Sequence, residues 1–159
     1  MKNSILFLGF ISLALFSSCG EGEKVTPPRD LSEDVTIIQN YIAENNISGV
    51  ESTGSGLYYK IESNGYGIQA AAGKTVSVDY TGKLLDGTVF DSSIGRGSFT
   101  FVLGQGQVIA GWDEGIALFR RGGNGTLYIP SQLAYGSRGQ GSITPNSVLI
   151  FDITVVNVQ

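Results

Sequence analysis

Histidine is absent from the 159-residue sequence, and cysteine occurs once, at Cys19. These absences exclude a Ser-His-Asp triad, a Cys-His dyad, a disulfide framework and a His- or Cys-based zinc site within this chain. Charged residues make up only 15% of the chain, the formal net charge is −4, and Lys and Arg do not cluster. Without a basic stripe, the sequence lacks the electrostatic footprint of a nucleic-acid-binding protein. We therefore predict no metal and no nucleic-acid partner.

Proline is also scarce, at 4 residues, whereas glycine is abundant, at 23 residues. This glycine content, with 42% apolar residues and few charges, excludes collagen, a coiled coil and a disordered chain. It is typical of a fold with many tight turns between short strands. The length suits one main domain with a short extension.

The N-terminus has the pattern of a targeting segment. Lys2 precedes an apolar run over residues 5–16, which is too short for a membrane-spanning helix and suits the hydrophobic region of a signal peptide. Two serines stand before Cys19, a junction that resembles a bacterial lipobox; the alternative is a buried cysteine in a core helix. We predict that residues 1–18 are a lipoprotein signal peptide and that Cys19 is lipidated. The protein is then lipid-anchored in the cell envelope, at the outer membrane, with the membrane face left open.

Residues 19–31 lack periodicity and contain two adjacent prolines, so we predict a flexible tether there. After it, Asp30 and Glu33 form a capping signal, and apolar residues three or four apart predict a helix over 32–44, with a linker that runs to residue 53. A single helix of this length is marginal in water. Its apolar stripe must therefore pack on the main domain or on a second copy of the chain, and both alternatives are open.

From residue 54 to the C-terminus at 159, the pattern changes to the period of two that is typical of strands. Glycine-rich turns separate five such segments, at residues 57–61, 76–80, 99–103, 126–129 and 148–158. Between the third and fourth segments, Trp112, Ile116 and Phe119 have helical spacing, which predicts one short helix. The predicted fold class is α+β, an antiparallel sheet packed on that helix.

Several common functional-site motifs are only partly matched in this chain and are rejected. Gly73, Lys74 and Thr75 resemble the end of a phosphate-binding loop, but Ile68 stands where the first glycine would be and a strand follows. No acidic run has the spacing of a calcium loop, and acidic residues beside turns are ordinary, so a paired-carboxylate glycosidase site is not supported. Two glycosylation sequons behind a bacterial lipobox receive no role.

Four ordered segments carry a more specific signal: VDYTG at 78–82, DGTVFDSS at 86–93, VIAGWDEG at 108–115 and LAYG at 133–136. Together they resemble the FK506-binding-protein (FKBP) family of peptidyl-prolyl isomerases, and residues 144–152 resemble the family's last loop and strand. The resemblance covers residues 54–159 and implies a curved five-stranded antiparallel sheet wrapped around one short helix. The N-terminal helix is similar to the extension of exported bacterial members, some of which dimerise through it.

The resemblance also implies the residues of the site. Asp91 is expected to bind the Tyr80 hydroxyl and Arg96, while the Tyr135 hydroxyl and the Ile109 backbone N–H hold substrate carbonyls. The implied catalytic residues are Tyr80, Phe90, Asp91 and Tyr135. The implied substrate-binding residues are Phe99, Val108, Ile109, Trp112, Ile143, Phe151 and Arg96, with Trp112 as the floor of the pocket.

The implied activity is cis–trans isomerisation of X-Pro bonds in exported proteins during folding. Rotating an amide needs no nucleophile, metal, cofactor or proton carrier, which agrees with the composition. The implied partners are proline-containing polypeptides and FK506-like macrolides. Two other classes are a non-catalytic proline-binding module or holdase chaperone, and an adhesin or structural lipoprotein, but the pocket residues favour the enzyme. The loop at 136–145 is shorter than in many members, so substrate preference is not transferred.

Overall fold

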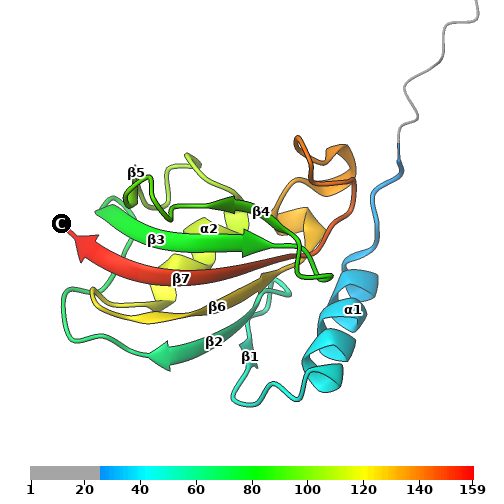
Figure 1. The fold of residues 1–159 in the computed structure, drawn as a ribbon, viewed down its shortest axis with the longest axis horizontal. Coiled ribbons are helices and arrows are strands. Elements are labelled where there is room, and N and C mark those ends of the chain that lie inside the picture. Colours follow the sequence, from blue (N-terminus) through cyan, green and yellow to red (C-terminus); the bar gives the residue numbers. More distant parts are fainter. Residues whose placement is uncertain (1–25) are drawn as a thin grey trace, which may run out of the picture.

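The computed structural model describes residues 26–159, and the predicted signal peptide and Cys19 lie outside the described residues. One antiparallel sheet has a short helix behind it and a longer helix at its end (Figure 1). In chain order the elements are α1 (Leu31–Glu44), β1 (Glu51–Ser52), β2 (Tyr58–Ser63), β3 (Thr75–Lys83), β4 (Val89–Ser92), β5 (Phe99–Val102), α2 (Ala110–Gly115), β6 (Asn124–Ile129) and β7 (Leu149–Val158). In the described part of the chain, no helix is long and apolar enough to cross a membrane.

The strands lie in the order β1-β2-β6-β7-β3-β4, and β5 also pairs with β3. The long strand β3 therefore has β7 along one edge and two short strands along the other, β5 at residues 75–78 and β4 at residues 81–83. Bulges interrupt the register, with the extra residue on β2, β4 and β7. Bulges increase local twist, which helps the sheet curve around α2.

The sheet has seven strands rather than the predicted five. The two additional strands are β1 and β4, with two and four residues. Strand β1 is too short to display a period of two, and a bulge interrupts the pairing of β4 with β3. The α+β class and the antiparallel pairing are confirmed.

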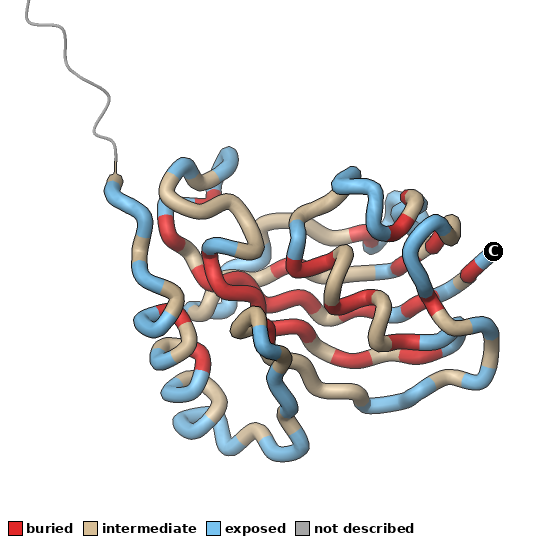
Figure 2. The backbone as a smooth tube through the Cα atoms, turned by 180° about the vertical axis from the view of Figure 1, so that it is seen from behind, coloured by how far each residue is buried: buried red, intermediate tan, exposed pale blue. Residues whose placement is uncertain are grey.

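Alternation along the central strands separates two apolar clusters on opposite sides of the sheet. The inner core lies between the sheet and α2 and contains Trp112, Phe119, Leu127, Phe151 and Val155 among its buried residues. Figure 2 shows the buried residues gathered along the central strands and the exposed ones on the loops. The predicted short helix spans residues 110–115 and continues as a 3₁₀ turn, Ile116–Leu118.

Glycine lets α2 approach β6 closely enough to close the inner core. A Cβ atom on Gly111 would lie 2.4 Å from Cγ2 of Ile129, and one on Gly115 would lie 2.6 Å from Cδ1 of Leu127. Both distances are shorter than any real carbon–carbon contact, so side chains at these two positions would push the helix away. The spacing of four residues places both glycines on the face of α2 that meets β6.

The outer cluster fixes α1 to the main domain. Its buried residues are Ile38 of α1 together with Tyr128, Val148 and Ile150 on the outer face of the sheet. Of the two alternatives for the apolar stripe, the structure therefore shows intramolecular packing. The predicted cap is also confirmed, because the Asp30 side chain accepts the Ser32 N–H at 3.1 Å.

The end of the predicted tether requires a correction. Residues 27–31 were expected to be flexible, yet the Pro27 carbonyl accepts a hydrogen bond from Asn146 at 2.9 Å, and helix α1 begins at Leu31. The adjacent prolines predicted an extended backbone, but a partner 119 positions further along the chain could not be predicted from local composition.

Candidate functional site

A cavity of about 210 Å³ opens beside α2 on the inner side of the sheet. Strands β3, β4, β5 and β7, the start of α2 and the loop after β6 all contribute to its wall. The lining residues are Tyr80, Phe90, Asp91, Phe99, Gln107, Val108, Ile109, Trp112, Tyr135 and Phe151. Nine of these ten residues were singled out in the sequence, so the fold brings the predicted set together.

Trp112 forms the floor, held by aromatic rings that meet it edge to face. Its ring centroid lies 5.0 Å from that of Tyr80 and 5.2 Å from that of Phe151, with interplanar angles of 81° and 80°. Phe90 meets Phe151 in the same manner at 5.4 Å. Such T-shaped pairs fix ring orientation as well as burying area. The floor is therefore a rigid apolar surface.

Asp91 is the one carboxylate in the lining, and its two oxygens have different partners. One oxygen accepts the Tyr80 hydroxyl at 2.5 Å, and the other pairs with the Arg96 guanidinium. The Asp91 carboxylate also accepts the Ser92 backbone N–H at 2.9 Å. The carboxylate is thus held by three donors and leaves the Tyr80 ring oriented against the floor.

These contacts move the pKa values of Asp91 and Tyr80 further apart. Burial raises the pKa of Asp91, but the hydrogen bonds from Tyr80, Arg96 and Ser92 and the charge of Arg96 outweigh it and leave the pKa below its ordinary value. Burial, followed by the bond to Asp91, raises the pKa of Tyr80 to about 12. Burial also raises the pKa of Tyr135. At neutral pH the site therefore holds one carboxylate, one guanidinium and two neutral phenols.

Several hydrogen-bond donors in the lining have no protein partner among the described residues; they include the buried Nε1 of Trp112, the Ile109 backbone N–H and the Tyr135 hydroxyl. Ile109 stands at the N-cap of α2, and within the described residues its N–H has no backbone acceptor. The Tyr135 hydroxyl belongs to the loop that follows β6 and lies in the cavity wall. An N–H and an O–H in an apolar cleft suit the carbonyl groups of an extended peptide.

Two predicted residues do not line this cavity. Ile143 is 6% exposed and packs in the inner core. Arg96 lies outside this lining; its guanidinium pairs with Asp91, and its Nε atom donates to the Ser92 carbonyl at 2.8 Å. Both residues lie on loops, and the conformation of each loop determines where the side chain points.

Gln107 lines the cavity and was missed in the sequence. Its side-chain oxygen accepts the Val102 N–H of β5 at 2.9 Å, which ties the segment before Ile109 to the edge of the sheet. A glutamine in a glycine-rich loop has no periodicity to reveal it. Its position two residues before Ile109 was the only available signal.

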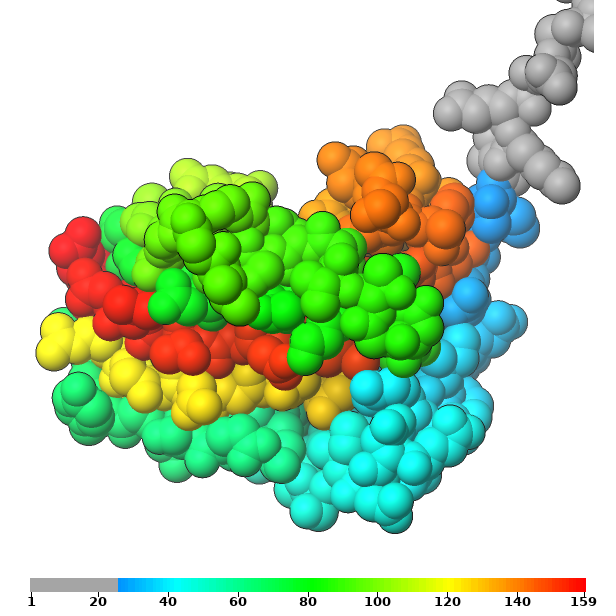
Figure 3. Space-filling view, viewed as in Figure 1, coloured from blue at the N-terminus to red at the C-terminus, as the bar shows by residue number. Residues whose placement is uncertain are grey.

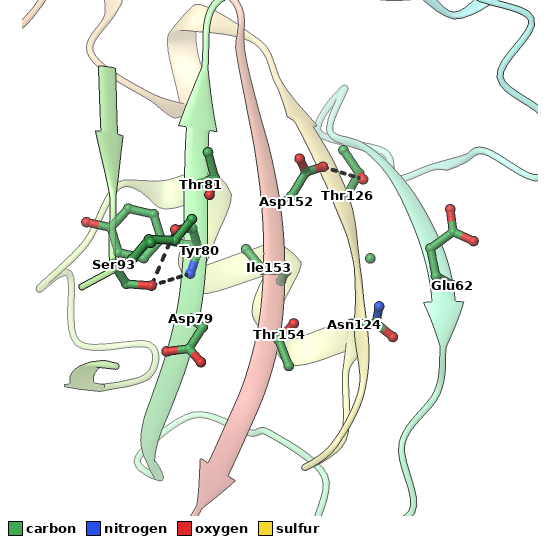
Figure 4. Close-up of a pocket in the computed structure, with 12 residues that line it drawn as sticks. Glu62, Asp79, Tyr80, Thr81, Ser93, Asn124, Thr126, Asp152, Ile153 and Thr154 are labelled. Carbon is green, nitrogen blue, oxygen red and sulfur yellow. Dashed lines mark hydrogen bonds between the residues drawn. The ribbon is translucent and has the colours of Figure 1, made fainter. Parts of the chain in front are cut away.

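A larger hollow, of about 420 Å³, lies on the outer face of the sheet and has a different character (Figure 4). Its wall is polar, and its carboxylates already have partners: Asp152 binds Lys83 at 2.5 Å and Thr126 at 2.9 Å, and Asp79 accepts the Ser98 hydroxyl at 2.7 Å. This is the ordinary polar face of an antiparallel sheet that contacts water on one side. The aromatic cavity is therefore the candidate site.

Comparison with known proteins agrees with this geometry. Residues 67–156 match the family model described as FKBP-type peptidyl-prolyl cis-trans isomerase. The chain is 50% identical over 112 residues to a probable FKBP-type peptidyl-prolyl cis-trans isomerase FkpA of Neisseria meningitidis, covering 69% of this chain and 40% of that one. It is 44% identical over 138 residues to the FkpA of Aeromonas hydrophila, covering 86% and 51%.

Among solved structures, the chain is similar to the crystal structure of FkpA from Escherichia coli, with a TM-score of 0.70 and 34% identity over 81% of this chain and 62% of that chain. The chain spans about half the length of the curated relatives described above. The region that the family model matches, residues 67–156, contains every residue that lines the aromatic cavity.

Proposed function

Since the chain belongs to the FKBP-type peptidyl-prolyl cis-trans isomerase family, we propose that it catalyses cis–trans isomerisation of X-Pro bonds in exported proteins during folding. The observation that carries the proposal is the aromatic cavity, which has a tryptophan floor, one organised carboxylate and hydrogen-bond donors that the described residues leave without a partner. Unaided X-Pro isomerisation takes tens to hundreds of seconds and can limit folding. Such proteins therefore benefit from a catalyst.

The residues that line the cavity explain how it could lower the barrier to rotation of an X-Pro bond. The barrier of about 18–20 kcal/mol arises from amide resonance, which places negative charge on the carbonyl oxygen, where water stabilises it. An apolar floor such as Trp112 removes that water from the prolyl amide, and the twisted amide, with less resonance, loses less by the transfer. The Ile109 N–H and the Tyr135 hydroxyl would hold the flanking carbonyls. No residue needs to exchange a proton with the substrate.

Asp91 orients the site and does not act as a base. Its lowered pKa keeps it ionised, and its bonds to Tyr80 and Arg96 hold the phenol ring at the cavity wall. A fixed negative charge beside the bound amide also favours the state in which the carbonyl oxygen carries less negative charge. The same apolar lining supports binding of FK506-like macrolides in competition with peptide.

The proposed location is the cell envelope. The apolar run and the lipobox-like junction support a signal peptide over residues 1–18 and a lipid anchor on Cys19 of a bacterial outer membrane. Prolyl isomerisation on that membrane would act on proteins that fold after export. A dimer through α1 is a further alternative, although the apolar stripe of α1 already packs on its own domain.

The deciding experiment measures exchange between the cis and trans forms of a short X-Pro peptide by NMR, with and without residues 20–159. Acceleration that an FK506-like macrolide abolishes would support the proposal. Peptide binding without acceleration would instead identify a non-catalytic proline-binding module or holdase. If the chain neither binds the peptide nor accelerates exchange, both the isomerase and the binding-module hypotheses are wrong.

A further inference from the structure

A short segment ahead of the family domain is tied to the loop that supplies part of the cavity wall. We call residues 27–34 the strap; it contains the end of the predicted tether and the first turn of α1. The loop at 131–146 connects β6 to β7 and carries Tyr135. Figures 1 and 3 show the two segments side by side, the strap in blue and the loop in orange.

The first contact holds the residues where the loop begins. Asp34 is 0% exposed, and one of its oxygens accepts both the backbone N–H of Ser131 at 2.7 Å and the Ser131 hydroxyl at 2.6 Å. Its other oxygen binds the Arg29 guanidinium at 2.8 Å. The Gln132 side chain donates to the Arg29 carbonyl at 2.7 Å. A buried carboxylate with this many partners cannot move without leaving a charge unpaired, which is strongly unfavourable.

The second contact holds the residues where the loop ends. Asn146 is 8% exposed and adopts a positive φ of 58°. Its side-chain oxygen accepts the Arg29 N–H at 3.2 Å, and its side-chain nitrogen donates to the Pro27 carbonyl at 2.9 Å. The backbone N–H of Asn146 donates to the Gly136 carbonyl at 2.8 Å, which closes the loop on itself. The strap therefore joins both ends of the loop.

Tyr135 lies between these two points of attachment. It follows Ser131 by four residues, and the next residue, Gly136, accepts the bond from Asn146. We propose that Asp34 and Asn146 are positioning residues, which act through the loop to hold Tyr135 in the wall of the substrate cavity. The inference rests on the proposed function, and it assigns a task to a segment outside the matched region at 67–156.

The expected effect is on substrate binding. Tyr135 offers a hydroxyl to a substrate carbonyl in the ground state and in the transition state alike, so its displacement removes uniform binding. Loss of uniform binding raises KM and leaves kcat nearly unchanged. A role confined to stability would change neither constant while the protein stays folded.

Two variants and a matched control test this in the full-length chain. Asp34→Ala removes the first contact, and Asn146→Gly removes the second while keeping a residue that tolerates positive φ. Each should raise the peptide KM by about tenfold with kcat within about twofold of wild type. Asp34→Asn, which keeps an acceptor for the Ser131 N–H, should recover most of the loss.

The control is Ile38→Ala, which weakens the packing of the same helix in the outer cluster without touching the loop. A KM for Asp34→Ala equal to that of Ile38→Ala, with both proteins folded, would overturn the positioning role. Failure of the proposed isomerase function can be distinguished from failure of the positioning role, because in the first case the wild-type chain does not accelerate exchange. If it still binds the peptide, the same comparison is made with Kd: a tenfold rise supports the positioning role, and a value equal to the control overturns it.

Discussion

In the proposed mechanism, Asp91 acts at the cavity wall without transferring a proton. Its two oxygens bind a phenol and a guanidinium, so its charge is fixed in position while the Tyr80 ring is held against Trp112. The proposed role of Asp91 therefore depends on its fixed position and charge rather than on its basicity.

Replacing Asp91 should separate catalysis from binding. Asp91→Val keeps similar bulk but removes the carboxylate, so we expect the isomerisation rate to fall by about tenfold or more, about 1.4 kcal/mol of barrier, with a smaller loss of peptide affinity. Phe90→Ala removes pocket area and should reduce affinity and rate together. Exchange spectroscopy and calorimetry on the same samples give both quantities. Activity of Asp91→Val equal to wild type would show that the role given to Asp91 is wrong.

The ionisable groups at the site also predict its dependence on pH. The pKa of Asp91 is lowered, those of Tyr80 and Tyr135 are raised, and the chain has no histidine. No group at the cavity changes charge between about pH 5 and 9, so the isomerisation rate should be constant over that range. A bell-shaped rate profile centred near neutrality would contradict the mechanism.

The same shifts predict where stability is lost. A lowered pKa for Asp91 means that its contribution is present above the ordinary pKa and disappears as the pH falls through the folded value. The raised pKa of Tyr80 has the opposite sense: its contribution is present below the ordinary value and is lost as the pH rises toward about 12. Urea midpoints across the pH range measure both losses.

At the scale of elements, the position of α2 decides the position of the floor. Trp112 follows Gly111, whose lack of a side chain lets the helix contact Ile129 of β6. Gly111→Ala should push α2 outward, reduce the unfolding free energy by about 1–3 kcal/mol, and change the fluorescence of Trp112, the one tryptophan in the chain. Urea unfolding followed by fluorescence reports both effects.

Gly54→Ala, at a glycine outside α2, is the control for the Gly111→Ala substitution. Its backbone does not need positive φ, and a Cβ atom there would meet nothing within 4 Å. We expect a change in unfolding free energy below about 0.5 kcal/mol and unchanged tryptophan fluorescence. Equal behaviour of the two variants would mean that close approach of α2 to β6 does not control the floor.

At the scale of the whole molecule, the anchor and the catalytic domain should be separable. Cys19 lies ahead of the described residues, and the cavity is formed entirely by residues from Tyr80 onward. Cys19→Ala should therefore release the protein from membranes and leave the urea midpoint and the isomerisation rate unchanged. Each acyl chain lost removes about 0.8 kcal/mol of membrane affinity per buried methylene. Retention of the variant in salt-washed membranes would rule out anchoring through Cys19.

The sequence alone determined the features that depend on local order. Alternation revealed the longer strands, and the Asp30 cap and apolar spacing revealed α1 nearly to its ends. The family resemblance identified nine of the ten residues that line the cavity, and eight of these lie within the ordered motifs. These predictions hold because periodicity, capping and motif order are properties of neighbouring residues.

Tertiary structure decided everything that depends on partners distant in sequence. The two-residue strand β1 exists only beside β2, and Ile143 packs in the core because its loop folds inward. Helix α1 packs on its own domain, and Asp34 binds Ser131 across 97 positions. No local pattern encodes such a pairing, because the residues next to an aspartate in sequence do not show whether its carboxylate is buried or which distant group it binds. Only the folded chain removes water from Asp34 and makes Ser131 its partner.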